Sequence, residues 1–192
     1  MTHLEAVLQL RFGDANRNVD TIHKTVIEQA NPCSGTTLRF RVAAEADMPC
    51  LVPLINSAFS IETFLEGTRT DEIRLANMMC KGTILVAESE SGQLLGCVYV
   101  EVRGQRGYLG QLAVDPTHQG SGLARRVVEA AEDHLRRQGC EGIDITVLSL
   151  RPELPRIYRR YGYIESGTEE FHPTQPLKPG EKCHSIVMSK QL

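Results

Sequence analysis

Residues 112–126 read LAVDPTHQGSGLARR and pass through three kinds of local structure in quick succession. The apolar run Leu112–Val114 is typical of the end of a buried strand. Asp115-Pro116 then breaks the pattern, and two closely spaced glycines lead into a sequence with helical periodicity. A strand, a glycine-rich turn and a long helix in this order leave unpaired backbone N–H groups at the helix start.

A helix start of this kind favours an anionic ligand. Its free N–H groups and the positive end of the helix dipole attract negative charge, and glycine lets the backbone approach a ligand closely. The segment therefore predicts a pyrophosphate cradle, and Arg125 in the first turn is placed to supplement it. A Walker loop would need Gly-Lys-Ser/Thr where this chain has Gly122-Leu123-Ala124. The dinucleotide fingerprint needs a third glycine where Arg125 stands, and Asp144 lies inside a predicted strand rather than at its end. Nucleoside triphosphates and nicotinamide cofactors are therefore disfavoured.

The segments before the loop predict a strand, two helices and an antiparallel meander. Residues 38–42 alternate, with Leu38, Phe40 and Val42 expected to face the core. A helix should follow Asp47 as its N-cap, with Pro53 in its first turn or at a kink. After a loop over residues 60–69, a second helix should begin at Thr70, with Ile73 and Met78 behind it. Three strands joined by short turns then cover residues 83–87, 94–102 and 108–114.

After the loop, the chain predicts a long helix that ends at Gly139 and a strand over residues 143–150. A short helix over residues 154–161 and two strands, near Tyr163 and at 184–188, complete the pattern. Together these elements predict an α/β fold of the α+β type: a mixed, mostly antiparallel central sheet with helices on both faces.

The first residues differ from this orderly pattern. Residues 20–30 have the spacing of an amphipathic helix, followed by turn residues. We therefore divide the chain into an N-terminal extension, residues 1–37, and one domain, residues 38–192, with no chemistry visible in the extension.

Two motifs carry a family resemblance. Gln119–Ala124, QGSGLA, resembles the Gln/Arg-x-x-Gly-x-Gly/Ala signature of the GNAT superfamily of N-acetyltransferases. Residues 157–163, IYRRYGY, resemble the family's Leu-Tyr-x-x-x-Gly-Phe segment, and residues 184–190 resemble its closing strand. Residues 151–154 and the pair Cys183-His184 are also similar to those of a bacterial subgroup. The resemblance spans roughly residues 38–190.

The resemblance implies an acyl-CoA-dependent N-acyltransferase with acetyl-CoA as co-substrate and no metal. In the family, the loop binds the pyrophosphate of coenzyme A and the preceding strand binds its pantetheine arm. The positions implied here, with Arg125 added from its place in the first turn, are Leu112, Ala113, Val114, Gln119, Gly120, Ser121, Gly122, Leu123, Ala124 and Arg125. Many relatives carry Asn seven residues before the motif tyrosine and Ala four before it. Arg151 and Leu154 stand there, so the cofactor contact of that Asn is not carried over.

Catalysis by direct transfer needs a neutral amine, a stabilised oxyanion and a proton for the leaving thiolate. Tyr158 aligns with the family's general-acid tyrosine and is the leading catalytic candidate; the alternative is a buried aromatic that fills the helix–sheet interface. The base is open: the position of the family's glutamate holds Tyr108, and the nearest carboxylate is Glu101 on the adjacent strand. A backbone N–H near Val114 is expected to stabilise the oxyanion. A covalent route through Cys97 or Cys80 is less favoured, because nothing pairs a base with either thiol.

The acceptor is the least determined part of the prediction. Family members contact it through the loop between the first two helices, which makes Glu62, Glu66 and Arg69 candidates. The leading hypothesis is a primary amine of a small molecule. A protein or peptide amine is the alternative within the family, and a catalytically silent acyl-CoA sensor is a further one, motivated by the missing glutamate at position 108.

Composition and charge bear on nucleic-acid binding, membrane insertion and cellular compartment. A net charge of −3 with a pI near 6.1 argues against nucleic-acid binding, and no stretch approaches the roughly 20 apolar residues that span a bilayer. The six cysteines are scattered without metal-ligand spacing, which favours a reducing, cytoplasmic compartment. Cys50, Cys97 and Cys140 are expected in the core. Similar proteins commonly form dimers, and the extension could contribute to a homodimer.

Overall fold

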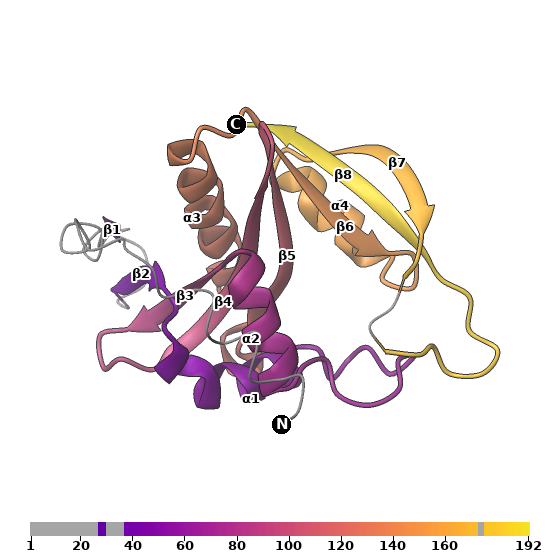
Figure 1. The fold of residues 1–192 in the computed structure, drawn as a ribbon, viewed down its shortest axis with the longest axis horizontal. Coiled ribbons are helices and arrows are strands. Elements are labelled where there is room, and N and C mark those ends of the chain that lie inside the picture. The colour runs from indigo at the N-terminus through magenta and orange to yellow at the C-terminus, as the bar shows by residue number, and fades with distance from the viewer. Residues whose placement is uncertain (1–26, 30–36, 173–174) are drawn as a thin grey trace, which may run out of the picture.

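The protein is described by a computed structural model, which covers residues 27–29, 37–172 and 175–192, the first of these by their backbone alone. One sheet of eight strands runs through these residues, in the order β1-β2-β3-β4-β5-β6-β8-β7 (Figure 1). The strands are β1 (Ile27–Gln29), β2 (Leu38–Val42), β3 (Thr83–Ser89), β4 (Leu94–Arg103), β5 (Arg106–Val114), β6 (Gly142–Leu148), β7 (Ile164–Glu170) and β8 (His184–Gln191). The helices are α1 (Met48–Ala58), α2 (Glu72–Lys81), α3 (Leu123–Arg137) and α4 (Glu153–Arg160), with short 3-10 turns η1 (Glu45–Asp47) and η2 (Pro116–His118).

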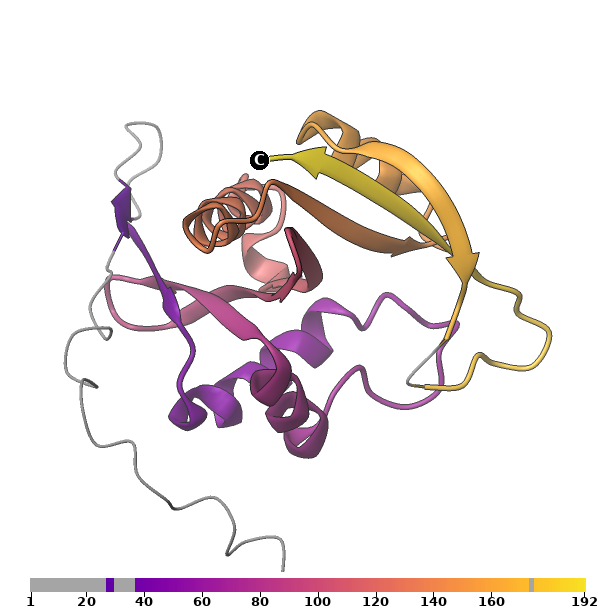
Figure 2. The same ribbon diagram turned by 45° about the horizontal axis from the view of Figure 1, so that its top comes forward.

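Every neighbouring pair of strands is antiparallel except β5 and β6, which are parallel. The crossover between this parallel pair is α3, as expected for a connection that must return to the same end of the sheet. Helices cover both faces of the sheet (Figure 2). The predicted fold class is therefore confirmed. Among the described residues, every helix is too short or too polar to traverse a lipid bilayer.

Two apolar cores lie on the two faces. Helices α1 and α2 pack Leu51, Ile55 and Leu75 against one face, where Val86 and Cys97 project from β3 and β4. Helices α3 and α4 cover the other face with a larger set, which includes Val127, Leu135 and Tyr158 from the helices and Val98, Leu109 and Ile145 from the strands. The period-2 pattern of the strands thus supplies both cores at once.

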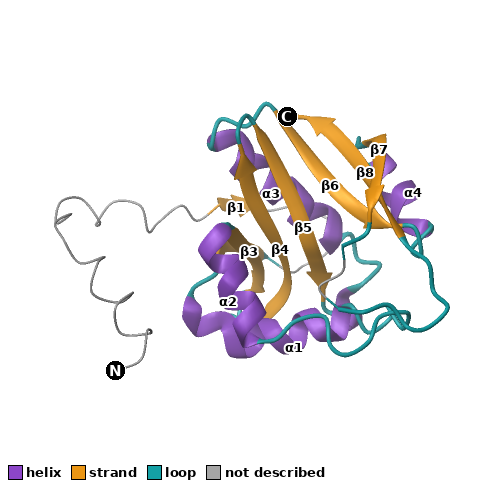
Figure 3. Ribbon diagram, turned by 45° about the vertical axis from the view of Figure 1, so that its right-hand side comes forward, coloured by secondary structure: helices purple, strands orange, loops and turns teal. Residues whose placement is uncertain are grey.

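The parallel pair is joined over only part of its length. β5 and β6 are in register from Arg106↔Gly142 to Leu109↔Ile145, and beyond that point neither strand has the other as a partner. Figure 3 shows the two strands side by side at one end and apart at the other. β5 also carries an extra residue opposite β4, between Ala113 and Gly110, and Gln111 at this bulge has a φ of +47°. The sheet is therefore opened where β5 approaches the glycine loop.

The predicted N-terminal helix is wrong where it can be compared. Residues 20–26 and 30 of that segment lie outside the described residues, but Ile27–Gln29 form β1, an antiparallel edge strand paired with Leu38–Phe40. Unpaired backbone groups along the edge of β2 provide this pairing, and a local helical pattern does not anticipate it.

Smaller differences have local causes. Val42 is 53% exposed, because the chain leaves the sheet there and Ala43 turns inward instead, with its N–H donated to the Ile84 carbonyl. The second helix is capped by Asp71, whose carboxylate accepts from the Arg74 N–H, rather than by Thr70. One turn of α2 faces solvent, which leaves Ile73 exposed.

The first helix and the cysteines complete the comparison. Asp47 is the N-cap of α1 as predicted, but Pro53 lies inside the helix rather than in its first turn. Cys97 and Cys140 are buried as expected, whereas Cys50 is exposed.

Candidate active site

The glycine loop is held by its own side chains. Asp115 accepts hydrogen bonds from the backbone N–H and the hydroxyl of Thr117, at 2.8 and 2.5 Å, and these bonds, the hydroxyl's first, lower the pKa of its carboxyl. Ser121 Oγ donates to the His118 carbonyl at 2.6 Å, and Gln119 Nε2 donates to the Val114 carbonyl at 3.4 Å. The polar side chains therefore fix the turn, and the backbone is left to face a ligand.

The two glycines of the loop adopt conformations that other residues avoid. Gly120 has a φ of +76°, and Gly122, the N-cap of α3, has a φ of +84°. A Cβ built at either position would meet nothing within 4 Å, so the space in front of the loop is open. The first intrahelical bond runs from the Arg126 N–H to the Gly122 carbonyl, and the N–H groups before it belong to the orphan donors of the helix start. This arrangement fits the pyrophosphate cradle that the sequence predicts.

Arg125 takes a different direction. Its side chain is 64% exposed, and its Nε lies 2.9 Å from Glu129 Oε1 one turn further along α3. The guanidinium is thus paired on the helix surface, and contact with a phosphate would require it to leave Glu129.

Tyr158 lies in the core on the face of the sheet that α3 and α4 cover, and, besides burial, Tyr108 of β5 is among the groups that raise the pKa of its hydroxyl. Tyr158 is 7% exposed on α4 and makes edge-on contacts with the rings of Tyr161 and Tyr163, at centroid distances of 6.0 and 5.6 Å. Leu112 packs against the same core cluster, so the tyrosine and the end of β5 share one environment. Burial raises the pKa of Tyr158, and its hydroxyl forms no hydrogen bond within the described part of the chain. A protonated hydroxyl without a partner in the described part of the chain is suited to proton donation.

Glu101 lies on the other face of the sheet, and β-pairing places it opposite Tyr108. Its Oε2 accepts from Arg103 at 2.9 Å and from the Tyr99 hydroxyl at 3.0 Å, and the Arg103 bond is the main cause of its lowered pKa. The carboxylate borders a cavity of about 360 Å³ between the ends of α2 and α3, with Lys81 and His134 on its walls. Tyr108 does not line this cavity but a second one, described below.

Tyr108 occupies the position that the sequence comparison left without a carboxylate. Its ring folds back over Gly110, where an added Cβ would come within 2.8 Å of ring carbon Cε1 and 3.1 Å of the hydroxyl. The Arg103 guanidinium stacks over the ring at 3.9 Å, and the same arginine binds Glu101. Glycine at position 110 therefore lets the Tyr108 hydroxyl lie along β5 toward the bulge.

A second cavity, of about 330 Å³, lies beside this tyrosine. Its walls come from five strands and from two loops, those between α1 and α2 and between β7 and β8; they include Arg69, Arg103, Tyr108, Thr146, Gln175 and Ser185. The two loops are joined by a bridge between Leu65 and Leu177 and by the Glu66 N–H, which donates to the Pro176 carbonyl at 3.0 Å. The cavity thus has a roof that is itself hydrogen-bonded.

The three predicted acceptor residues have different environments. Arg69 lines the cavity, with its guanidinium 4.5 Å from the centre of the Phe59 ring. Glu62 is buried and binds both Arg69, at 3.3 Å, and Arg151, at 3.1 Å. Glu66 is exposed and contributes its backbone to the roof.

Sequence reasoning missed several residues of this region. Gln175 and Ser185 had no motif around them, and their places depend on the pairing of distant loops and strands. Tyr108 was visible only as an unexpected residue at a family position. Cys97 is excluded as a ready nucleophile, because burial raises the pKa of its thiol to about 12.

Comparison with known proteins identifies the family and the fold of the chain. Residues 51–163 match the model of the Acetyltransferase (GNAT) family, which is more than half of the chain. The chain belongs to the GNAT family. The yncA protein of Salmonella typhimurium, solved with its cofactor acetyl-CoA, has the same fold, with a TM-score of 0.63, 22% identity, and coverage of 80% of this chain and 93% of that one. The ribosomal-protein-S18-alanine N-acetyltransferase of Escherichia coli superposes with a TM-score of 0.65 at 18% identity, over 81% of this chain and 94% of that one.

Curated relatives match the GNAT domain over shorter lengths. A mycothiol acetyltransferase of Propionibacterium freudenreichii is 31% identical over 100 residues, which are 50% of this chain and 32% of the relative. The glucosamine 6-phosphate N-acetyltransferase 1 of Oryza sativa is 31% identical over 112 residues, 54% of this chain and 66% of the relative. The N-alpha-acetyltransferase 30 of Saccharomyces cerevisiae is 29% identical over 90 residues, 43% and 51% of the two. The chain thus spans about a third to two thirds of these relatives.

Proposed function

We propose that this GNAT protein transfers acetyl from acetyl-CoA to a primary amine of a small molecule by direct attack. The observation that carries the proposal is the opening of the sheet between β5 and β6, with the glycine loop at its end, Tyr158 in the core on one face of the sheet and a cavity on the other face. Three functions that acetyl transfer requires are then close together: an anion cradle, a proton donor and a space for the acceptor.

The residues present fit acetyl-CoA. The loop Gln119–Ala124 would hold its pyrophosphate through backbone N–H groups, and Leu112–Val114 would line its pantetheine arm. When bound, acetyl-CoA supplies the activated acetyl group as a thioester. Tyr158 would give its proton to the departing sulfur, and its raised pKa keeps the phenol protonated over the whole neutral range.

On the acceptor side, Tyr108 would hydrogen-bond the amine at the mouth of the gap. Glu101 remains a candidate base, but its lowered pKa and its place beside another cavity support a positioning role. In that role it orients Arg103, which stacks on Tyr108. The amine would then lose its proton to water.

The closed roof supports a small acceptor over a peptide. An extended peptide needs an open groove, whereas the bridge between Leu65 and Leu177 closes this side of the cavity. The volume of about 330 Å³ falls at the small end of the usual range for small-molecule sites. The relative named for glucosamine 6-phosphate acts on a small molecule, while those named for ribosomal-protein alanine and N-alpha acetylation support the peptide alternative.

The proposal is tested first by thermal melting with acetyl-CoA, free CoA and NAD. We expect both CoA species to raise the melting temperature and NAD to leave it unchanged, because a ligand of the folded state stabilises it by mass action. Thiol release is then followed with a panel of small amines and with short peptides. Binding without thiol release in any arm would favour the sensor alternative, and release with peptides alone would favour the peptide alternative.

A further inference from the structure

Gln175 is a buried residue with an unused hydrogen-bond donor. It lies in the roof of the acceptor cavity and is only 4% exposed. Its side-chain nitrogen Nε2 has no hydrogen-bond partner in the described part of the chain, and among the side-chain N and O atoms there that are fully inaccessible to solvent it is the only one with none. An unpaired buried donor costs about 1–3 kcal/mol, so its retention in a cavity wall indicates a partner that arrives with a ligand. An amide NH₂ only donates, and the partner must therefore be an acceptor atom such as oxygen.

The surroundings of Gln175 specify what kind of oxygen fits. Arg69 lines the same cavity, with its guanidinium over the Phe59 ring, and within the described ranges its hydrogen bonding is limited to one long bond of 3.3 Å to Glu62. Glu62 is shared with Arg151, so this carboxylate is divided between two guanidinium groups. A guanidinium has five N–H donors in a planar fork, and most of those of Arg69 remain for a ligand.

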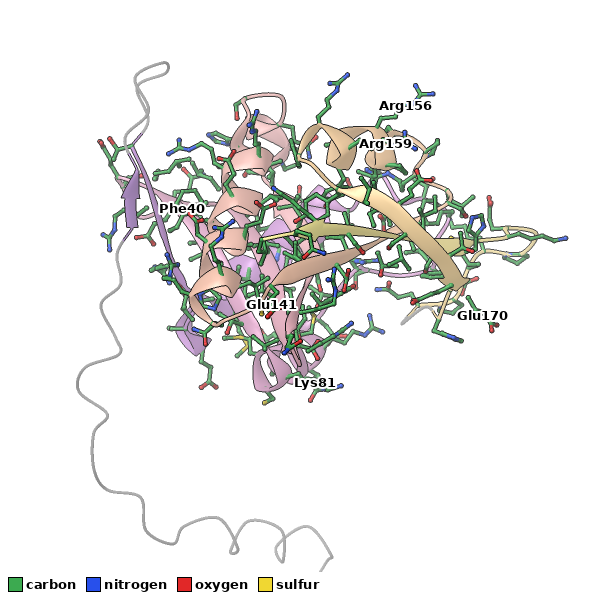
Figure 4. The ribbon with its side chains drawn as sticks, turned by 90° about the horizontal axis from the view of Figure 1, so that it is seen from above. Phe40, Lys81, Glu141, Arg156, Arg159 and Glu170 are labelled. Atoms are coloured by element: carbon green, nitrogen blue, oxygen red, sulfur yellow. The ribbon has the colours of Figure 1, made fainter. Side chains whose placement is uncertain are left out.

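Two carboxylates in the cavity wall limit the negative charge that a ligand can carry. Glu169 and Glu170 lie at the rim of the cavity on β7, and Figure 4 shows Glu170 at the tip of that strand, at the periphery of the molecule. Both carboxylates are exposed, and they would repel a doubly charged phosphate more strongly than a single carboxylate. A planar monoanion therefore matches the donors of the roof best.

We propose that the acceptor is an amine that also carries a carboxylate, an amino acid or a close analogue, and that Gln175 and Arg69 bind this carboxylate. This inference rests on the proposed function, since the amine would point past Tyr108 toward the gap between β5 and β6. It makes Gln175 a specificity-determining residue of the acceptor site.

The experiment measures equilibrium binding to the full chain loaded with free CoA, so it does not depend on turnover. The probes are the individual standard amino acids, their carboxamides and the corresponding amines without a carboxyl group. We expect at least one amino acid to bind with a Kd on the order of 10-fold lower than its carboxamide, the ratio expected for a hydrogen bond to a charged group. Equal affinity of acid, carboxamide and amine, no measurable binding of any acid, or tighter binding of a short peptide amide would overturn the inference.

The variant Gln175→Leu separates ligand recognition from packing. It should weaken binding of the amino acid on the order of 10-fold and leave the carboxyl-free amine unchanged. Its melting temperature without ligand should be equal or higher, because the substitution removes an unpaired buried donor. Gln93→Leu, at an exposed turn, is the matched control and should change neither value. Unaltered discrimination between acid and amine in Gln175→Leu would contradict the assignment.

A second variant guards against a folding defect in the first. Arg69→Gln keeps a polar side chain and leaves Glu62 paired with Arg151. It should lower the affinity for the acid more than Gln175→Leu does, again without effect on the carboxyl-free amine. Retained CoA binding with lost acid selectivity supports the inference, whereas absent CoA binding in the unmodified protein would count against the proposed function alone.

Discussion

The two ends of the β5–β6 pair have opposite properties, although they belong to the same two strands. At one end the strands are in register from Arg106 to Leu109, and at the other, Gly110–Val114 have no partner in β6. The paired end uses its polar side chains to hold strands together. The open end leaves Gly110–Val114 without a partner in β6, and Tyr108 beside it lines a cavity.

The paired end is stabilised by an ion pair on one face of the sheet and by close packing on the other. Arg106 donates to both carboxylate oxygens of Asp144 across the parallel strands, each at 2.6 Å, and Asp144 also accepts from Ser189 on β8. On the other face, Leu135 of α3 rests on Gly107, where an added Cβ would come within 2.5 Å of it. The contrast teaches that one strand can stabilise the fold with its first half and leave its second half free for binding.

The largest effect is expected at the open end, from Gly122→Glu. A carboxylate at the helix start would face the pyrophosphate, and two unit charges about 4 Å apart near a protein surface repel by about 4 kcal/mol. The Kd for acetyl-CoA should therefore rise on the order of 100-fold or more, as measured by isothermal titration calorimetry.

Gly139→Glu is the control for this substitution, at the other end of the same helix. Gly139 has a φ of +83°, close to the +84° of Gly122, and a Cβ would meet open space at both. Both variants should lose about 1–2 kcal/mol of stability from the left-handed conformation. Only the Gly122 variant should lose cofactor binding, and a similar loss in both would mean that strain, rather than charge at the cradle, is responsible.

The next effect concerns proton donation at the open end. Tyr158→Phe should lower kcat on the order of 100-fold, the usual contribution of a general acid, with little change in acetyl-CoA affinity. Tyr163→Phe is the matched change in the neighbouring ring, whose hydroxyl donates to buried Glu132 at 3.1 Å. That variant should lose about 1.5–3 kcal/mol of stability and keep its kcat. Equal kcat in wild type and Tyr158→Phe would assign Tyr158 to packing.

The dependence of kcat on pH tests the same role of Tyr158 as the general acid. Burial raises the pKa of Tyr158, so its proton is present below its ordinary value of 10.0 and is lost only above it. Stopped assays at saturating amine should therefore show kcat that rises or stays level up to pH 10. A decline of kcat between pH 7 and 9, with the protein still folded, would speak against Tyr158 as the acid.

The smallest effect is expected at the paired end, from Asp144→Asn. Arg106 holds the pKa of Asp144 below its ordinary value of 3.8, so this carboxylate stabilises the fold above that value and loses its contribution as the pH falls through the folded-state pKa. Because both side chains are about a third exposed, 38% for Arg106 and 31% for Asp144, screening limits the loss at pH 7 to about 1 kcal/mol.

Urea unfolding at several pH values checks this prediction. The difference between wild type and Asp144→Asn should be largest at pH 7 and should shrink below pH 4, while turnover at pH 7 stays within about twofold. A loss of turnover as large as that of Tyr158→Phe would remove the distinction between the two ends.

Local patterns predicted the elements because each is set by neighbours in the sequence. The helix face of Leu123, Val127, Ala131 and Leu135 is buried as its spacing predicts, and Gly139 ends the helix with a positive φ. The errors arise where tertiary contacts override the pattern. Ile27–Gln29 pair with a sheet edge, and Ile73 lies on a turn of α2 that no other element covers. The single-residue shift from Thr70 to Asp71 reflects two adjacent residues that can both cap a helix.

The fold class, the glycine loop and the candidate tyrosine could be predicted from the sequence, since these depend on short spacings and on backbone conformations that few residues allow. The tertiary structure determines what each charged side chain pairs with and which cavity it lines. It paired Glu62 with two arginines, placed Glu101 beside Arg103 and another cavity, and brought Gln175 over the sheet from a distant loop. These pairings could not be predicted, because the burial and pairing of a side chain depend on partners far along the chain, and no local spacing encodes those contacts.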